Sequence, residues 1–471
     1  MSAETATLKE LCELIVDCPH STPKWTEEGV VVLRNQNIRN GKLDLSSPSY
    51  TDEKGYRARI KRAEPQAGDI VFTREAPMGE VCLIPEGLKC CLGQRQVLLR
   101  PKNSISGGYL YWALQSPFVQ HQISWNEGTG TTVSNVRIPV LESLDIPRQE
   151  GRERSIAKIL GSLSKKEQVN KEINQTLEQM AQAIFKSWFV DFDSVKAKIA
   201  ALEAGGSEED ALLAAMQAIS GKPAGELARL QTEQPDHYTN LRATAELFPS
   251  AMQESELGEI PEGWEVLPLS EMVDLIGGGT PKKSESSFWN GDICWFSVKD
   301  APSVGNVFVV DTEDKITAEG LNRSSTKLLP VGTTIITARG TVGKLAITGT
   351  VTAMNQSCYG AVSSDKTGPY FNYLRLSEAV GTLKRNTHGA VFDTITRSTF
   401  ETVLQPRSCL ALRQRFEEAV IPMFEAIKKN LLENNSLSEA RDLLLPKLLS
   451  GELVVSEDDA ELNGLKEAAH V

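Results

Sequence analysis

The chain has 471 residues, of which 40% are hydrophobic and 24% are charged, and its formal net charge is −12. This length predicts two or more domains, and the composition is that of a globular protein. No run approaches the roughly 18 apolar residues of a membrane helix, and the first ten residues, MSAETATLKE, lack the basic and apolar regions of a signal peptide. We therefore expect a cytoplasmic protein with no membrane partner.

The first predicted block, residues 1–150, is mixed in secondary structure. Apolar runs bounded by Gly and Pro, such as GVVVLR (29–34) and DIVF (69–72), predict short strands, and residues 107–123 predict one helix. The eight cysteines include no C-x-x-C pair, and the five histidines have no zinc-ligand spacing. We expect unpaired thiols in a reducing compartment and no metal site.

A long helix is predicted over residues 151–190, and a second over residues 412–450. Their apolar and amide positions follow steps of three and four, which is a heptad pattern. Asn170 and Asn174 recur as Asn430 and Asn434 at a shift of 260, and polar seam residues fix register at a cost in stability. We expect the helices to pair; the alternative is an amphipathic helix packed on its own domain. The predicted seam is Ile156, Leu160, Leu163, Asn170, Asn174, Leu177, Ile184, Phe416, Val420, Met423, Ile427, Asn430, Asn434, Leu437 and Leu444.

The segment between the first helix and the second block, residues 191–257, has no counterpart after the second helix. It is rich in alanine and acidic residues, and we expect a solvated connector with one or two short helices. Residues 191–262 hold 5 basic and 14 acidic residues, whereas residues 1–150 hold 17 and 18 and residues 263–411 hold 14 and 14. The negative charge is therefore local, and it does not exclude DNA from the two blocks.

The second block, residues 258–411, repeats the first. AGDIVFTREAPMGEVCLI aligns with VGTTIITARGTVGKLAI, so that Thr73 meets Thr337 and Gly79 meets Gly343, and GTGTTVSNVRIPVLESLDIP aligns with THGAVFDTITRSTFETVLQP. Shifts between 258 and 264 indicate a duplication of whole domains. TTIIT (333–337) and KLAIT (344–348) predict strands, and residues 368–385 predict a helix. Pro422 predicts that the first turns of the second long helix are kinked or separate, and residues 451–471 form a C-terminal tail.

Motifs of common enzyme classes do not fit. GTVGKL lacks the first P-loop glycine and has Leu345 where a magnesium-binding hydroxyl is needed, and no G-x-G-x-x-G follows a strand. The Asp-or-Asn-Pro-Pro-aromatic tetrapeptide of amino-methyltransferases is absent. DICWFSVK (292–299) has no acidic residue before its lysine and matches a nuclease pattern poorly. The sequence favours a protein that binds and does not catalyse.

Residues suited to DNA recognition follow the predicted strands. Arg74 and Arg339 each lie in the repeated turn, where an arginine side chain can project, and its fork matches guanine O6 and N7 or a phosphate. Lys344 suits phosphate, amides suit adenine, and glycines at 128, 130 and 277–279 allow close backbone approach. Ordinary surface turns are the alternative explanation. The candidates are Thr22, Lys24, Arg34, Asn35, Asn37, Arg74, Gln94, Arg95, Thr129, Thr131, Thr280, Lys282, Lys283, Ser297, Lys299, Arg339, Thr341, Lys344, Gln356 and His388.

Nearly the whole chain resembles a type I restriction–modification specificity subunit. The resemblance rests on IPEGWEVLPLSEM (260–272), AIFKSWFVDFD (183–193), SEARDLLLPKLLSGEL (438–453) and the paired segments ending in DIP and LQP. It implies two target recognition domains of mixed α+β fold, separated by a pair of long antiparallel coiled-coil helices, with no catalytic centre. Each domain would read one half of a bipartite double-stranded DNA target. The long acidic segment is a departure from the family pattern.

The resemblance also implies partners. Two methylation subunits would assemble around the helices, and two restriction subunits would join them. This chain would bind no cofactor, S-adenosylmethionine being expected on the methylation subunit and ATP and Mg on the restriction subunit. Helices of about 35 residues span roughly 50 Å, enough to address half-sites about one turn of DNA apart. Two other hypotheses remain open, a non-catalytic coiled-coil scaffold whose repeated domains bind a protein or sugar, and an undetected nuclease.

Overall fold

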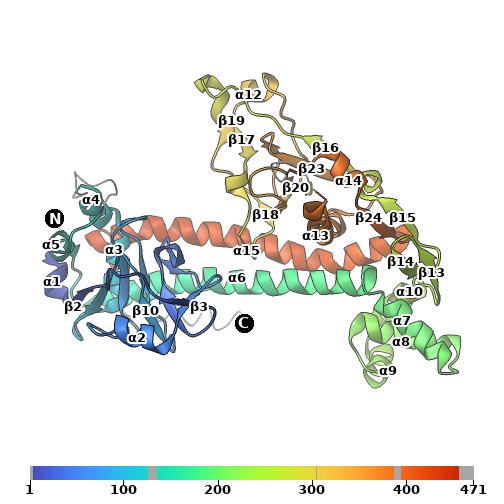
Figure 1. Cartoon of the computed structure of the whole chain (residues 1–471), viewed down its shortest axis with the longest axis horizontal. Coiled ribbons are helices and arrows are strands. Elements are labelled where there is room, and N and C mark those ends of the chain that lie inside the picture. Colours follow the sequence, from blue (N-terminus) through green and yellow to red (C-terminus); the bar gives the residue numbers. More distant parts are fainter. Residues whose placement is uncertain (1–3, 126–134, 304, 387–393, 456–471) are drawn as a thin grey trace. The chain divides into compact units, whose positions relative to one another are not determined.

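The computed structural model describes residues 4–125, 135–303, 305–386 and 394–455, and the chain divides into two compact units (Figure 1). The first unit comprises residues 1–167 and 435–471, and the second comprises residues 168–434. The long helices α6 (Glu153–Phe189) and α15 (Leu410–Ser450) therefore each contribute residues to both units. Among the described helices, none combines the length and hydropathy needed to cross a membrane.

The globular part of the first unit has two sheets. The main sheet has the strand order β2-β11-β8-β9 with antiparallel neighbours, and the second has the order β10-β4-β7-β3 with β10 parallel to β4. The predicted strands in GVVVLR and DIVF are confirmed as β4 and β8. The elements are β1 (Thr5–Thr7), α1 (Leu8–Leu11), β2 (Cys12–Asp17), β3 (Trp25–Thr26), β4 (Val30–Leu33), η1 (Asn35–Asn37), β5 (Ile38–Arg39), β6 (Lys42–Leu43), β7 (Ser49–Thr51), α2 (Glu53–Arg59), β8 (Ile70–Thr73), β9 (Val81–Leu83), β10 (Cys90–Leu92), β11 (Gln96–Pro101), α3 (Gly107–Gln115), α4 (Pro117–Trp125), α5 (Ile138–Glu142) and β12 (Asp145–Pro147).

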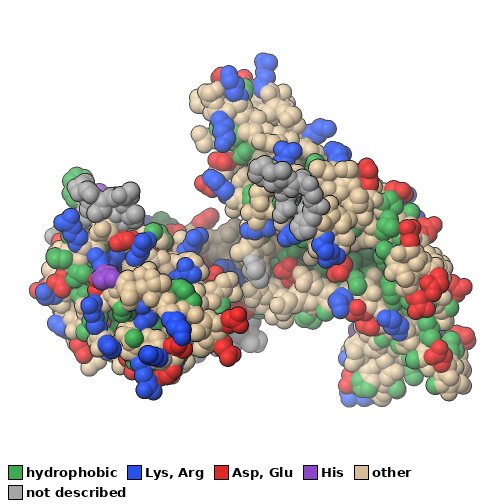
Figure 2. Space-filling model, viewed as in Figure 1, with side chains coloured by type: hydrophobic (Ala, Val, Ile, Leu, Met, Phe, Trp, Pro, Cys, Tyr) green, Lys and Arg blue, Asp and Glu red, His purple; other side chains and the backbone are tan. Residues whose placement is uncertain are grey.

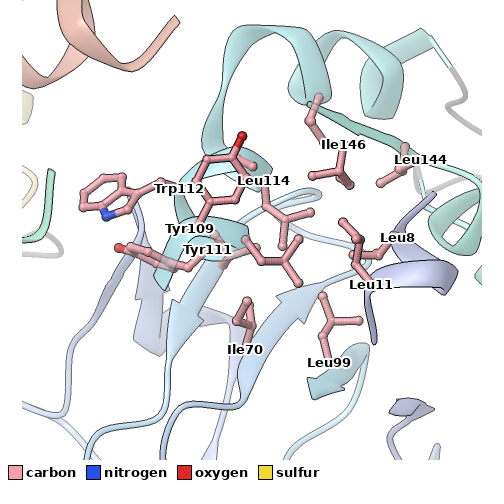
Figure 3. Packing of buried hydrophobic residues seen from close by; sticks show 14 of the residues in the cluster. Leu8, Leu11, Ile70, Leu99, Tyr109, Tyr111, Trp112, Leu114, Leu144 and Ile146 are labelled. Carbon is pink, nitrogen blue, oxygen red and sulfur yellow. The ribbon is translucent and has the colours of Figure 1, made fainter. Parts of the chain in front are cut away.

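Both faces of the main sheet are buried. Side chains alternate along a strand, so Ile70 and Leu99 face a cluster that also contains Tyr109 of α3 and residues of α1 (Figure 3). Val71 and Leu98 point to the opposite face and pack with residues of the second sheet. The sheet is thus covered by helices on one side and by strands on the other.

The prediction of a single helix over residues 107–123 is wrong, because the segment forms α3 and α4. Ser116, the residue between them, is extended, with φ −65° and ψ 149°. A proline disfavours helical backbone at the residue before it, and Pro117 begins the next helix, where its missing N–H is not needed. The Ser116 hydroxyl accepts the Val119 amide at 3.4 Å.

The globular part of the second unit repeats this plan. Its main sheet has the order β16-β23-β20-β21-β18, its second sheet has the order β19-β17-β22 with β17 parallel to β22, and β15 pairs with β24 as β1 pairs with β12. The predicted strands in TTIIT and KLAIT and the helix over residues 368–385 are confirmed as β20, β21 and α13, and the α+β class is confirmed. The elements are β15 (Glu265–Pro268), α11 (Leu269–Met272), β16 (Val273–Gly277), η2 (Ser286–Phe288), β17 (Trp289–Phe296), η3 (Val298–Asp300), β18 (Phe308–Val309), β19 (Lys315–Ile316), α12 (Ala318–Asn322), β20 (Thr334–Thr337), β21 (Leu345–Thr348), β22 (Thr352–Met354), β23 (Cys358–Ser363), α13 (Pro369–Arg385), α14 (Arg397–Glu401) and β24 (Leu404–Arg407).

The acidic segment is more structured than predicted. It forms four helices and one strand: α7 (Asp193–Glu203), α8 (Glu208–Ser220), α9 (Ala224–Glu233), α10 (Pro235–Glu246) and β13 (Met252–Ser255). This strand pairs with β14 (Gly258–Pro261), at the start of the second block. Met216, Leu227 and Ala245, one from each of three helices, belong to a separate buried cluster. The expectation of a solvated connector with one or two helices is wrong, because apolar residues at helical spacing bury a core between the charged faces.

The two long helices lie side by side in each unit. In the first unit, Ile156 and Leu160 of α6 share a core cluster with Leu448 of α15, and Arg441 donates to Glu167 at 3.1 Å. In the second unit, Phe185 of α6 packs against Phe416 of α15, with ring centroids 5.6 Å apart.

Paired asparagines join the helices in the second unit. Asn170 Nδ2 donates to Asn434 Oδ1 at 2.9 Å, and Asn430 Nδ2 donates to Asn174 Oδ1 at 2.9 Å. The pairing is antiparallel and reciprocal, since the duplication relates Asn170 to Asn430 and Asn174 to Asn434. Amides that hydrogen-bond to one another across a helix seam favour one register and oppose others.

The predicted seam residues differ in burial. Those that are buried are Ile156, Leu160, Asn170, Asn174, Phe416, Val420 and Ile427. Those that are half-buried are Leu163, Leu177, Ile184, Met423, Asn430, Asn434, Leu437 and Leu444. The expectation that the start of the second helix is separate is wrong, because α15 runs unbroken past Pro422. Burial of Val420 and Phe424, which flank the proline, opposes its cost of about 3 kcal/mol.

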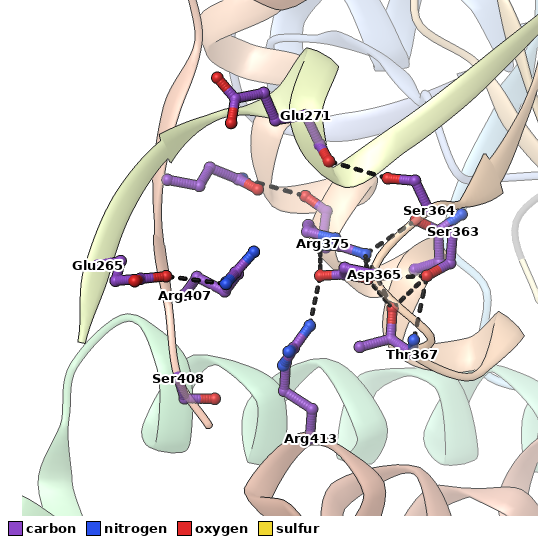
Figure 4. Close-up of polar contacts among 12 residues, drawn as sticks. Glu265, Glu271, Ser363, Ser364, Asp365, Thr367, Arg375, Arg407, Ser408 and Arg413 are labelled. Atoms are coloured by element: carbon purple, nitrogen blue, oxygen red, sulfur yellow. Dashed lines mark hydrogen bonds and ion pairs between the residues drawn. The ribbon is translucent and has the colours of Figure 1, made fainter. Parts of the chain in front are cut away.

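A buried charged cluster ties α15 to the second globular part (Figure 4). Arg375 of α13 donates to Asp365 at 2.9 Å, Arg413 of α15 pairs with the same carboxylate, and Ser363 and Thr367 donate to it at 2.8 and 2.7 Å. Burial by itself would raise the pKa of Asp365, but the hydrogen bonds and charge of Arg375 hold this pKa well below its usual range. Asp365 is the shared counter-charge of two guanidinium groups that are both almost fully buried.

Replacing Asp365 by asparagine should lower the free energy of unfolding by about 3–5 kcal/mol, because it leaves two buried arginines without their counter-charge. Urea unfolding measures the change. Glu265→Gln is the control, since Glu265 is exposed and the loss of its pair with Arg407 should cost at most about 1 kcal/mol. The wild-type advantage should be constant above about pH 4 and shrink at lower pH, because a carboxylate with a lowered folded-state pKa loses its contribution as it is protonated. An advantage that grows on acidification would contradict this assignment.

Replacing Asn430 by leucine should destabilise the second unit by about 1–3 kcal/mol, because the fully buried Asn174 loses its donor. The double variant Asn174→Leu, Asn430→Leu should recover most of this loss, since neither amide is then left unpaired. Thermal unfolding of both single variants and the double variant gives the coupling energy. Additive losses would show that the two amides do not depend on each other.

Candidate functional site

The repeated turn begins where β8 ends. The Thr73 amide donates to Glu80 O at 2.8 Å, and the Thr73 hydroxyl donates to Pro77 O at 2.7 Å and accepts the Glu80 amide at 3.0 Å. Gly79 donates to Thr73 O at 2.9 Å and has a φ of 85°, which favours glycine. One threonine thus closes the turn with its backbone and its side chain.

The turn after β20 uses the same bonds. The Thr337 amide donates to Lys344 O at 2.9 Å, and the Thr337 hydroxyl donates to Thr341 O and accepts the Lys344 amide at 2.9 Å. Gly343 donates to Thr337 O at 2.8 Å with a φ of 80°. The alignment at a shift of 264 residues therefore describes the backbone as well as the sequence.

This correspondence corrects one expectation about the arginines. Arg74 donates its amide to Arg95 O and accepts the Val136 amide, whereas the same two bonds in the second unit are made by Ala338, with Ser357 and Ile395. Arg74 therefore corresponds to Ala338, and Arg339 corresponds to Glu75. The two arginines do not occupy equivalent positions of the turn.

The side chains of two candidates in the first unit form hydrogen bonds within the protein. Arg74 Nε donates to Val136 O at 2.9 Å and Nη1 donates to Asp17 Oδ2 at 2.9 Å, so the side chain does not project as expected. Asn37 is buried, accepts the Arg34 amide at 2.9 Å and donates to Asp44 O at 2.9 Å, which closes the turn at η1. Both side chains are therefore held by hydrogen bonds within the protein.

Several other candidates lie along one edge of the first unit, formed by the loops before β11, after β4 and after β8. Gln94 donates to His20 O at 2.6 Å and to Thr22 Oγ1 at 3.3 Å. Asn35 donates to Glu75 O, and the exposed Arg95 pairs with Glu75 Oε2 at 3.2 Å. This recognition edge, as we call it, presents amide and guanidinium donors and is partly neutralised by its own carboxylates.

Two basic candidates flank the recognition edge of the first unit. The Arg34 guanidinium lies over the Trp25 ring, 5.3 Å from its centroid, and the largely exposed Lys24 contacts Asp52 at 3.3 Å. Trp25 is 44% exposed and was not a candidate. An exposed aromatic plane beside an arginine suits contact with a sugar or base.

The second unit has an equivalent recognition edge at the ends of β16, β20 and β22. Gly279 donates to Met354 O at 2.9 Å, and Ala338 donates to Ser357 O at 2.7 Å, which brings these loops together. Thr280 donates to Gln356 across this edge. Gly278 and Gly279 are in close contact with the protein itself, since an added Cβ would lie 1.9 Å from Asn355 O and 2.3 Å from Ser325 Oγ.

Arg339 and Lys344 are the most accessible cations of the second turn. Both are exposed, and the side chain of neither forms a hydrogen bond or an ion pair with another described residue. Thr341 between them is exposed as well. Two exposed cations on a short turn have the chemistry to contact a phosphate or guanine acceptors.

The remaining candidates of the second unit are less available. Lys282 pairs with Glu285 at 3.1 Å, Lys299 lies 3.8 Å from Glu313, and Ser297 caps η3 through Asp300. Lys283 is exposed. Thr129, Thr131 and His388, with the glycines at 128 and 130, lie outside the described residues.

Arg397 is a residue of the recognition edge that the sequence did not single out. It is exposed, donates to Leu275 O at 2.7 Å and lies 5.9 Å from the centre of the Tyr359 ring. These partners are 122 and 38 positions away in the chain, so no local pattern could have placed it.

The charge distribution supports a binding role for the globular parts. Lys and Arg side chains are spread over the visible faces of both, and Asp and Glu gather around the segment that contains α7–α10 and β13–β14 (Figure 2). Among the described residues, no group of three His, Cys, Asp or Glu side chains is arranged to hold a metal ion. All eight cysteines are unpaired, and burial raises the pKa of Cys82, Cys90 and Cys358 to about 12.

Comparison with known proteins agrees with this arrangement. Residues 2–179 and 261–403 match the family described as type I restriction modification DNA specificity domain. The HindI type I restriction enzyme specificity subunit of Haemophilus influenzae is 39% identical over 322 residues, covering 66% of this chain and 69% of the relative. The MjaIX specificity subunit of Methanocaldococcus jannaschii is 26% identical, covering 94% and 88%.

A solved structure has the same fold. The type I restriction–modification S subunit from M. genitalium matches with a TM-score of 0.50 and 14% identity, covering 96% of both chains. The family match extends over more than half of this chain and includes both copies of the repeated turn. The chain therefore belongs to the family of type I restriction–modification specificity subunits, which are non-catalytic DNA-recognition proteins.

Proposed function

We propose that each globular part reads one half of a bipartite DNA target through its recognition edge. The observation that carries this proposal is the repeated turn, which has the same backbone bonds in both units but different exposed side chains. A shared backbone gives both units the same means of approaching DNA, whereas different side chains would read different bases. Two readers on one chain require a target with two parts.

The long helices are the proposed spacer and docking element. Their paired asparagines favour one register, which suits a spacer of fixed length. Val169, Ile173 and Met180 lie on α6 at helical spacing and are 38%, 43% and 47% exposed. Apolar side chains left exposed on one helix face indicate a protein contact, and we assign this contact to a methylation subunit.

In the proposed complex, two methylation subunits and two restriction subunits act on the DNA that this chain selects, in the cytoplasm. S-adenosylmethionine would bind to the methylation subunits, and ATP and Mg²⁺ to the restriction subunits. The methylation subunit would extrude the target adenine from the duplex, since a base cannot be modified within the stack. This chain would supply only sequence recognition.

The purified complex with its methylation subunits should enrich a bipartite consensus from a random-sequence DNA pool. Two short blocks of fixed sequence, separated by a spacer of fixed length and free sequence, are expected, and methylated adenines in the host genome should lie within the same blocks. A pool that stays random would favour the scaffold hypothesis, in which the repeated domains bind protein or sugar. Metal-dependent cleavage by the isolated chain would instead favour a nuclease.

Arg339→Ala should weaken binding by about 1–3 kcal/mol and relax the sequence preference at one half-site only, because a bidentate arginine contact reads one base. Competition binding against DNA with either half-site randomised measures this. Arg229→Ala, which removes an exposed arginine of α9, is the matched control and should leave binding unchanged. An equal loss on all sequences would assign Arg339 to a phosphate.

A further inference from the structure

The two copies of the turn carry opposite charges at equivalent backbone positions. Glu75 corresponds to Arg339, and Glu80 corresponds to Lys344, as the shared hydrogen bonds of Thr73 and Thr337 establish. The turn of the first unit therefore has two negative charges where that of the second has two positive charges. DNA phosphates attract one arrangement and repel the other, so the two turns cannot meet DNA in the same way.

The carboxylates of the first turn are directed to the protein. Glu75 is 24% exposed in its side chain and pairs with Arg95 at 3.2 Å, and Glu80 accepts the Gly41 amide at 3.4 Å. Their counterparts, Arg339 and Lys344, are exposed and have no such partners among the described residues. The carboxylates of the first turn thus contact other parts of the protein, whereas the cations of the second turn are exposed to solvent.

Arg95 is placed where it can replace the missing cation. It accepts the Arg74 amide on its backbone carbonyl, the position that Ser357 has in the second unit, so Arg95 comes from a different loop than Arg339 does. Its side chain is 53% exposed, and its backbone has a φ of 67°. Gln94, which donates to His20 O at 2.6 Å, holds the same loop.

The geometry of the Glu75–Arg95 pair leaves the guanidinium fork free. Nε is the guanidinium nitrogen nearest to the carboxylate, and neither terminal nitrogen, Nη1 or Nη2, donates a hydrogen bond to another described residue. These are the donors that match guanine O6 and N7. A carboxylate on Nε also restricts rotation of the planar group, which positions the fork before DNA arrives.

On the basis of the proposed function, we infer that Arg95 reads a guanine in the half-site of the first unit, that Glu75 is its positioning residue, and that the first turn itself stays off the DNA. In the second unit the turn makes the contact directly, through Arg339 and Lys344. The duplicated backbone thus supports two different solutions to DNA recognition.

The test measures the base preference of the complex with its methylation subunits, using Glu75→Gln, Arg95→Ala and the double variant. Each single variant should reduce the preference for guanine at one position by about 5- to 150-fold, the worth of a bidentate contact. The double variant should be no worse than Arg95→Ala, because Glu75 acts through Arg95. Retained reading of the other half-site, the one that Arg339→Ala affects, shows that each variant is folded.

A charge-exchange pair provides the matched control. Lys344→Glu should weaken DNA binding about tenfold or more, whereas Glu80→Lys should change it less than twofold, because the first turn stays off the DNA. Tighter binding by Glu80→Lys, or a guanine preference that survives both Glu75→Gln and Arg95→Ala, would overturn the inference and leave the proposed function intact. Failure of the wild-type complex to enrich any consensus would overturn the proposed function itself.

Discussion

The reciprocal pairing of asparagines between α6 and α15 is the interaction on which the rest of the structure depends. Asn170 with Asn434, and Asn430 with Asn174, form hydrogen bonds inside a seam that is otherwise largely apolar. A purely apolar seam tolerates a shift of one heptad, but a shifted seam would leave the buried amides of Asn170 and Asn174 without these partners. The helices also enter the core of each unit, so a fixed register decides which helix residues each globular part can bury.

Duplication constrains the backbone far more than the exposed side chains. Thr73 and Thr337 make the same bonds because a turn that lost them would leave buried polar groups unpaired. Glu75 and Arg339, by contrast, project from equivalent positions without sharing any partner. The fold therefore preserves the placement of this turn while the chemistry of its exposed side chains changes, which fits the proposed reading of two unlike half-sites.

Sequence patterns predicted the features that depend on local periodicity. Strands β4, β8, β20 and β21 and both long helices follow from apolar spacing and the repeat. The break at Ser116 was missed because the apolar pattern continues past Pro117, and the core of α8–α10 was missed because its charged faces outweighed the spacing of Met216 and Leu227. The recognition edges were only partly predictable. Arg74 is of a residue type that suits DNA contacts, and it lies in the repeated turn. Its partner Asp17 is 57 positions away, so only the folded chain shows that its Nη1 is already hydrogen-bonded.

The net charge of −12 can be reconciled with DNA recognition through the pairing of individual cations. Four of the cations, Lys24, Arg95, Lys282 and Lys299, each lie near a carboxylate. Each would have to give up that interaction before it could contact a phosphate. Non-specific affinity grows with the number of phosphates neutralised, so pairing these cations keeps that affinity low. Under the proposed function, base contacts by residues such as Arg339 would then account for a larger share of the binding free energy. A weakly attractive surface with a few oriented donors favours discrimination between sequences over affinity for DNA in general.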